Sequence, residues 1–219
     1  MPSNAQAHFN TLIGNVDQLI TIHGRIKDGP GRRHEQEALH RAGVVMVIAA
    51  WESYVEQVVL EAVDIIGHTG GLAPAGIGHA GIAPPAPTWA QHSFALRKAE
   101  ISRLAKRFHT PDSTGVRDFF QNTFNFTPLS YWSWNSPRRQ WNDEEMRRRL
   151  NGWVKIRHCV AHGAQLPIDI PWIQNGQNLA RLNLSLLREC RNFFGRIVNQ
   201  TDAAFGAFIT QDYGINAPW

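Results

Sequence analysis

Apolar residues recur at steps of three and four along the N-terminal part of the chain, a pattern typical of an amphipathic helix. Between Ala5 and Ile26 they are Phe9, Leu12, Ile13, Val16, Leu19, Ile20 and Ile22. The tetrapeptide Asp28-Gly29-Pro30-Gly31 follows and predicts a break. We therefore expect a first helix over residues 5–26.

A second helix is predicted over residues 32–66, and its pattern changes along its length. Its middle, residues 44–51, is apolar on every face, so we expect other helices to surround it there. In its last third, one set of residues is predicted to face inward: Trp51, Val55, Val58, Val59, Ala62 and Ile66. Glu52 and Glu56 lie on the polar side. We expect this helix to be the central rod of a bundle.

The segment that follows is rich in Gly, Ala and Pro from Gly67 to Pro87 and has no periodicity. It predicts a flexible insertion, residues 67–90, within a single domain that spans residues 1–219.

Three further helices complete the predicted domain, together with one short helix. The three helices cover residues 91–108, residues 142–162 and residues 185–209. The second of them begins at a cap formed by Asn142 or Asp143 and runs to His162, and Gly163 is its expected stop. The short helix begins at a cap formed by Asp112 or Ser113 and ends at Phe124. No segment alternates with period two, so we expect no strand. The predicted fold class is all-α, a helical bundle of four to six helices.

Residues 119–134, FFQNTFNFTPLSYWSW, are dense in aromatic side chains and interrupted by Pro128. Rings at this density supply buried area and are typical of core packing. The alternative is a set of stacking surfaces for unpaired bases. Both interpretations stay open.

The charge balance is mildly basic, with a net charge of +4 and a pI near 9.4, and 18 of the 22 basic residues are arginine. This permits an anionic partner, since guanidinium groups match phosphate geometry. One set of cations could hold RNA phosphates or simply form a solvated surface: Arg103, Lys106, Arg107, Arg138, Arg139, Arg147, Arg148 and Arg149.

Cysteine usage and hydropathy favour a cytoplasmic protein. Cys159 and Cys190 make no disulfide framework, so we expect two reduced thiols. The N-terminal residues lack a charged start and a long apolar run, which argues against a signal peptide. The longest apolar run, residues 42–51, is shorter than a membrane span, so no membrane contact is expected.

The candidate chemistry lies in RRRLNGWVKIRHCVAHGA, residues 147–164. Its apolar stripe at helical spacing is Leu150, Trp153, Val154, Val160, Ala161 and Ala164, and Arg157 stands within it. A charge there needs a partner or a ligand. The partner could be Glu52 or Glu56, and the side chain could also extend along the surface to water.

His162 lies in the last turn of the same predicted helix, where the negative end of the helix dipole favours its charged form. Five positions correspond to about 140° on an ideal helix, so Arg157 and His162 diverge within one chain. Two copies of the helix that meet around a two-fold axis could bring both pairs together.

A metal site and a thiol nucleophile are the rival forms of chemistry. His158 and His162 share a helix face with Cys159 between them, but no further ligand completes a zinc set. The Cys159 thiol lies beside the apolar stripe, and no third group orients His162 as its base. We therefore expect neither a metal nor another cofactor.

The segment RHCVAHG, residues 157–163, resembles the signature of the HEPN superfamily: Arg, four residues, His, with a polar residue after the Arg. HRAGVVMVIAAWESYVEQVVLEA, residues 40–62, resembles the central helix of its RiboL-PSP-HEPN branch. The resemblance covers roughly residues 35–200. It implies a HEPN-like bundle that dimerises through the motif helices and forms a composite ribonuclease site at the dimer seam.

Arg157 and His162 match the two motif positions, and His158 matches the polar position. Many HEPN proteins that pair with a nucleotidyltransferase antitoxin carry a Tyr two residues after the motif His, where this chain has Ala164. The resemblance also implies a role as a toxin or antiviral effector, restrained by an antitoxin or regulatory protein or by assembly.

The expected activity is metal-independent endoribonuclease cleavage by attack of a 2′-hydroxyl, which leaves a 2′,3′-cyclic phosphate. His162 would be the base, Arg157 would stabilise the phosphate charge, and His158 would orient a neighbour. Glu52 would either pin Arg157 or lie on a solvated helix face. The alternatives are a catalytically inactive HEPN-like dimer that binds RNA or a protein, and a purely structural helical subunit.

Overall fold

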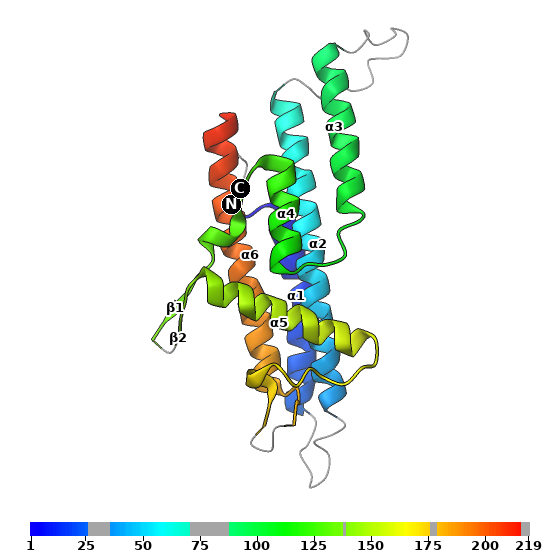
Figure 1. The fold of residues 1–219 in the computed structure, drawn as a ribbon, viewed down its shortest axis with the longest axis vertical. Coiled ribbons are helices and arrows are strands. Elements are labelled where there is room, and N and C mark those ends of the chain that lie inside the picture. The colour runs from blue at the N-terminus through cyan, green and yellow to red at the C-terminus, as the bar shows by residue number, and fades with distance from the viewer. Residues whose placement is uncertain (26–35, 71–87, 138, 176–178, 216–219) are drawn as a thin grey trace.

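Helix α2 (Glu37–Thr69) runs through the centre of the molecule and packs against α1 (Asn4–Arg25), α3 (Trp89–Ala105), α4 (Ser113–Phe124), α5 (Asp143–Ala161) and α6 (Leu184–Tyr213) (Figure 1). The computed structural model describes residues 1–25, 36–70, 88–137, 139–175 and 179–215. The all-α bundle and its central rod are confirmed.

The long helices α1, α2 and α6 lie side by side, and α5 crosses them (Figure 1). The core between them is aromatic: the Trp51 ring of α2 lies 5.8 Å from Tyr54, 6.1 Å from Trp132 and 6.0 Å from Phe194 of α6. Trp51 and Tyr54 are fully buried. Burial of such rings supplies much of the hydrophobic stabilisation of this bundle.

Of the described helices, α2 alone is long and apolar enough to cross a membrane by length and composition. More than half of its most apolar window, 56%, is buried inside the fold, and the core helix of a globular bundle passes the same test. Its packing against five helices accounts for its hydropathy without a bilayer.

Local capping explains where α4 and α5 begin. Asp112 accepts a hydrogen bond from the Gly115 N–H at 2.7 Å, and Asn142 and Glu145 form a reciprocal capping box at the start of α5. The predicted caps at Asp112 and Asn142 are confirmed. At its other end α5 stops at Ala161, because Gly163 adopts a φ of 65°, which favours glycine.

The predicted boundaries around the Gly/Pro-rich segment need correction. Helix α2 continues to Thr69 and α3 begins at Trp89, so both ends of the predicted 67–90 insertion are helical. Residues 71–87 lie outside the described part of the chain, as do residues 26–35 with the predicted break. Helix α3 ends at Ala105, short of the predicted residue 108.

The prediction of no strand is wrong for one short hairpin. Strands β1 (Trp134–Ser136) and β2 (Arg139–Trp141) pair antiparallel, with Trp134 opposite Trp141. Three residues are too few to produce a visible alternation in the sequence. The hairpin projects from the bundle between α4 and α5 in chain order (Figure 1).

The aromatic segment before the hairpin packs into the core, which confirms that interpretation for most of its rings. Phe119, Phe120, Phe124, Phe126 and Trp132 are buried. The Trp132 indole N–H donates to the Thr201 hydroxyl of α6 at 2.9 Å. These side chains fix the segment to α6 and are not available as open stacking surfaces.

Two details of helix burial differ from prediction. Within the predicted apolar middle of α2, Ala49 is exposed and Val45 and Met46 are half-buried, so this stretch is not surrounded on every face. In α5, Ile156 is fully buried although the predicted stripe omits it, whereas Ala161 is exposed. The reason is that α5 crosses the long helices, so its last turn leaves the core.

Candidate functional site

Arg157 lies where α5 crosses α2 and contacts an acid on that helix. Its Nη2 atom is 3.3 Å from Oε2 of Glu52, and the two side chains are 29% and 17% exposed. The Arg157 Nε is buried and has no hydrogen-bond partner among the described residues. Glu52 thus holds Arg157 by one long contact, which leaves donor capacity on the guanidinium.

Two exposed imidazoles follow Arg157 at the end of α5. His162 is the C-cap residue, and its backbone N–H donates to the His158 carbonyl at 3.1 Å. The two rings lie with their centroids 4.4 Å apart. The Ala164 N–H then donates to the Cys159 carbonyl at 2.8 Å, so the turn at Gly163 fixes the helix end that carries both rings.

A third histidine, His109, lies near the α2 carboxylates and was missed by the sequence analysis. It is exposed, in the loop between α3 and α4, and its charge acts on both Glu52 and Glu56 of α2. No motif or periodicity marks a loop histidine. Only the packing of the loop against α2 brings it beside these carboxylates.

That loop is anchored to the two helices that carry Glu52 and Arg157. The Trp51 indole N–H of α2 donates to the Pro111 carbonyl at 2.9 Å. The Ser113 N–H donates to the side chain of Asn151 in α5, also at 2.9 Å. Gly115 is required because an added Cβ would lie 2.2 Å from the Thr110 carbonyl oxygen.

The electrostatics of the α2 carboxylates reflect this arrangement. Burial raises the pKa of Glu52, and the positive charges of Arg157 and His109 oppose that rise. Burial and the charge of Glu52 raise the pKa of Glu56, and His109 again opposes it. The region therefore combines two partly buried acids with one guanidinium and three exposed imidazoles.

No interaction among the described residues joins Arg157 to His162. Arg157 turns toward α2, whereas His158 and His162 are exposed at the helix end. This agrees with the divergence expected from five helical positions. A single chain therefore presents the guanidinium and the imidazoles on one helix but in different directions.

The cations of the predicted phosphate-binding surface differ in their surroundings. Arg103, Lys106 and Arg107 are exposed at the end of α3 and in the loop after it. Arg147 and Arg148 form ion pairs one turn back on α5, with Asp143 and Glu144, and such exposed pairs constrain a cation only weakly. Arg138 lies outside the described residues.

Arg149 is enclosed, which corrects its place on a predicted phosphate-binding surface. Its side chain is 10% exposed and forms an ion pair with Glu189 of α6. Its Cζ lies 3.4 Å from the centroid of the Trp172 ring. Burial lowers its pKa, and the charge of the neighbouring Arg139 adds to this. Arg139 also pairs with Glu189, between the rings of Trp134 and Trp141.

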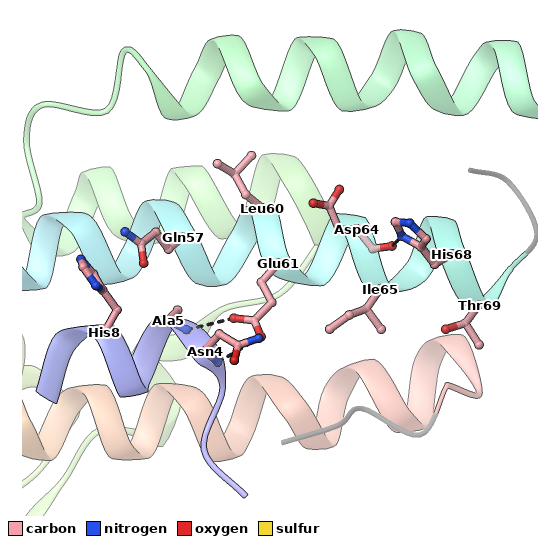
Figure 2. Close-up of a pocket in the computed structure, with 10 residues that line it drawn as sticks. All are labelled: Asn4, Ala5, His8, Gln57, Leu60, Glu61, Asp64, Ile65, His68 and Thr69. Atoms are coloured by element: carbon pink, nitrogen blue, oxygen red, sulfur yellow. Dashed lines mark hydrogen bonds between the residues drawn. The ribbon is translucent and has the colours of Figure 1, made fainter. Parts of the chain in front are cut away.

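A separate groove of about 850 Å³ lies along α1 and the C-terminal half of α2 (Figure 2). Its acids already have partners: Glu61 accepts from the Asn4 and Ala5 N–H groups at 3.0 Å each, and Asp64 pairs with Lys98. Glu61 thereby stabilises the N-terminus of α1. This groove contains neither motif residue.

Among the residues with described positions, no three His, Cys, Asp or Glu side chains are grouped so that they could hold a metal ion. Cys159 is half-buried, Cys190 is buried, and both are free thiols. Burial raises the pKa of Cys190 well above its ordinary value, so it behaves as a small apolar side chain.

Comparison with known proteins gives one family. A family model described as RiboL-PSP-HEPN matches residues 10–206. This range includes α2, the loop with His109, and the whole of α5, so the match extends over every residue of the candidate site. No curated protein and no solved structure matches the chain.

Proposed function

The chain belongs to the RiboL-PSP-HEPN family, and from that premise we propose that it is a metal-independent endoribonuclease whose site forms between two copies. The observation that carries the proposal is the surface at the α2–α5 crossing. There a half-buried Arg157 with spare donors lies on the same helix as two exposed imidazoles. A guanidinium and imidazoles are the groups that cleavage by a ribose 2′-hydroxyl requires.

In the proposed reaction His162 accepts the proton of the 2′-hydroxyl as O2′ attacks the adjacent phosphorus. The P–O5′ bond breaks, and His162 of the partner subunit donates a proton to the leaving O5′. The products are a 2′,3′-cyclic phosphate and a 5′-hydroxyl. Arg157 donates hydrogen bonds to the phosphate oxygens as negative charge builds up, with Glu52 holding its guanidinium in place.

His158 and His109 have supporting roles in this proposal. The His158 ring, 4.4 Å from that of His162, orients it. His109, from the anchored α3–α4 loop, adds positive charge beside Glu52 and Glu56. That charge weakens the field that two carboxylates would otherwise set against an incoming phosphate.

The dimer seam is proposed along the exposed small residues of α2. In the N-terminal half of α2, Ala42 and Ala49 are exposed and Val45 is half-buried. Small side chains allow close approach of a second helix, and Glu52 continues the same face toward Arg157. A two-fold axis here would bring two α5 ends to one site.

RNA is the proposed substrate and the cytoplasm the proposed location. Unrestrained RNA cleavage is harmful to a cell, so we extend the proposal to a toxin or antiviral effector held in check by an antitoxin, another regulatory protein or assembly. Harmless overexpression of the intact, active protein would contradict this extension.

The direct test is cleavage of a fluorescent RNA by the purified protein in EDTA, with DNA of the same sequence alongside. We expect RNA to be cut to cyclic-phosphate ends and DNA to survive. His162→Ala and Arg157→Ala should each lower the rate by about 10²–10⁴-fold. The matched control is His92→Ala, at an exposed histidine of α3 outside the site.

Loss of wild-type cutting in EDTA, or a His162→Ala variant that cuts at the wild-type rate, would refute the mechanism. The second candidate function is a dimer that binds RNA or a protein without cutting, and the Glu52 contact that already occupies Arg157 favours it. RNA binding by a wild-type protein that never cuts would establish that alternative.

A further inference from the structure

A polar groove lies on a different face of the molecule from the candidate site. It measures about 490 Å³ and is lined by residues of α1, β1 and α6: Asn10, Trp134, Arg191, Asn192, Gly195, Arg196, Asn199 and Gln200. None of these elements carries a motif residue. In Figure 1 the β1–β2 hairpin and the C-terminal end of α5 lie at opposite sides of the view.

The charge of this groove is positive. Its lining contains two arginines and no Asp or Glu. Arg191 is neutralised, because it donates to both carboxylate oxygens of Asp17 at 3.0 and 2.9 Å. Arg196 forms no ion pair with any acid of the described chain; its Cζ lies 5.0 Å from the Trp134 ring centroid. One uncompensated guanidinium held against an indole favours an anionic ligand.

The wall that carries Trp134 is held in place by side-chain contacts. Gln200 of α6 accepts from the Ser133 N–H at 3.1 Å and donates to the Ser133 carbonyl at 2.9 Å. The buried Phe193 ring lies parallel to the Trp134 ring, with centroids 6.4 Å apart. The Trp134 ring against which Arg196 lies is therefore held in place by the fold before any ligand arrives.

The groove also offers side-chain amides, which can both donate and accept. Asn10 and Asn192 are exposed, and Asn199 accepts from Gln6 through its oxygen, so within the described contacts its NH₂ group makes no hydrogen bond. Asn and Gln amides match the paired donor and acceptor edges of nucleobases, and arginine matches phosphate.

We propose that this groove binds a nucleotide unit, with Arg196 on the phosphate and the Asn10, Asn192 and Asn199 amides on the base. The source is either a strand of single-stranded RNA or a free nucleotide. A strand would make it an RNA-holding site separate from the cutting site. The proposal rests on the proposed function only for the choice of RNA as the probe.

A larger side chain at Gly195 would fill the groove and so test the proposal. It lines the floor on α6, and an added Cβ there would meet nothing within 4 Å. Gly195→Glu therefore adds a Cβ that contacts no neighbour and introduces a negative charge at a residue that lines the groove next to Arg196 in the sequence. Gly24→Glu is the matched control, since Gly24 is also helical with open space around it and lies about 21 Å along α1 from Asn10.

The probe is a fluorescein-labelled RNA hexamer with 2′-O-methyl groups, which lacks the nucleophile and cannot be cut. Binding is measured by anisotropy in the full-length protein. Gly195→Glu and Arg196→Gln should each raise the Kd about tenfold or more. Gly24→Glu and Arg188→Gln, the latter at an exposed arginine of the same helix, should change it less than about twofold.

Adenosine monophosphate as a competitor separates the two sources: displacement identifies a site for a free nucleotide, and retention of the hexamer identifies a strand site. Thermal unfolding of each variant confirms that the fold is intact. Equal hexamer binding by wild type and both groove variants, or no binding by wild type, overturns the proposal. His162→Ala should bind as wild type does, so failure of cutting and failure of this groove are distinguishable.

Discussion

Arg149 and Arg157 stand on one helix, α5, eight residues apart, and each pairs with a single glutamate from another helix. Arg149 is 10% exposed and has the Trp172 ring 3.4 Å from its Cζ. Arg157 is 29% exposed, with one contact of 3.3 Å and no cation–π contact among the described residues. The first guanidinium is built into the fold, and the second is held at its surface.

This difference shows that a buried arginine on α5 is not by itself a sign of function. Glu189 and the surrounding indoles replace the water that Arg149 loses, so no ligand is needed there. Both arginines have a buried Nε without a hydrogen-bond partner among the described residues, so that atom does not distinguish them. Arg157 differs in its greater exposure, its single contact of 3.3 Å and the exposed imidazoles that follow it on α5, so its guanidinium is the one that a ligand can reach.

The largest effect that separates the two arginines is on stability. We expect Arg149→Met to lower the free energy of unfolding by about 3 kcal/mol, because it leaves Glu189 less compensated and removes the stacking on Trp172. Urea denaturation measures this. The double variant Arg149→Met/Glu189→Leu should recover part of the loss, since it removes both charges. An Arg149→Met protein as stable as wild type would break the comparison.

The next effect concerns the loop that carries His109. Gly115→Ala places a Cβ against the Thr110 carbonyl, so the loop must shift at a cost of about 1–3 kcal/mol. Cleavage should fall together with stability, because the anchor to Trp51 and Asn151 is disturbed. Gly14→Ala, in open space on α1, is the control and should not destabilise. If Gly115→Ala proves neutral, the loop is not held as described.

A smaller effect is expected at His109 itself. His109→Gln removes an imidazole beside Glu52 and Glu56 whose protonated form is positive, and we expect cleavage to fall about tenfold with unchanged unfolding. His109→Lys keeps a positive charge and should retain more activity than His109→Gln. Equal rates for these two variants would show that charge at this position is not what matters.

The smallest effect is a pH dependence at Glu52. Burial raises its pKa above the ordinary value, and Arg157 opposes that rise. Arg157→Met should raise the pKa further, so the folded state holds its proton to higher pH than the unfolded state. Stability of the variant relative to wild type is then equal near pH 4 and falls as pH rises through the raised pKa.

Because the folded variant holds the Glu52 proton more tightly than the unfolded chain does, we expect the variant to lose stability between pH 4 and pH 7. Urea denaturation from pH 4 to pH 7 measures it. The double variant Glu52→Gln/Arg157→Met removes the titrating group and should lose the dependence. If the double variant still loses stability as pH rises, the pH dependence comes from a residue other than Glu52.

The sequence predicted the helical class, the central helix, the caps at Asp112 and Asn142, and Glu52 as a candidate partner of Arg157. Helical periodicity and capping depend on residues within one or two turns, so the chain itself carries that information. The family resemblance also followed from short segments, RHCVAHG and the α2 sequence, and the family match over residues 10–206 agrees with it.

Only the tertiary structure decided which arginine is enclosed and which side of α2 stays exposed. It also decided that His109 lies near Glu52 and Glu56 and that a groove forms around Arg196. The sequence pattern places Arg157 in an apolar stripe and Arg149 among the surface cations, yet Arg149 is the more buried of the two. Their environments differ because α5 crosses the bundle, bringing one end onto Glu189 of α6 and the other onto Glu52 of α2. Contacts between residues far apart in the chain depend on the angle at which helices cross, and the periodicity of apolar residues does not determine that angle.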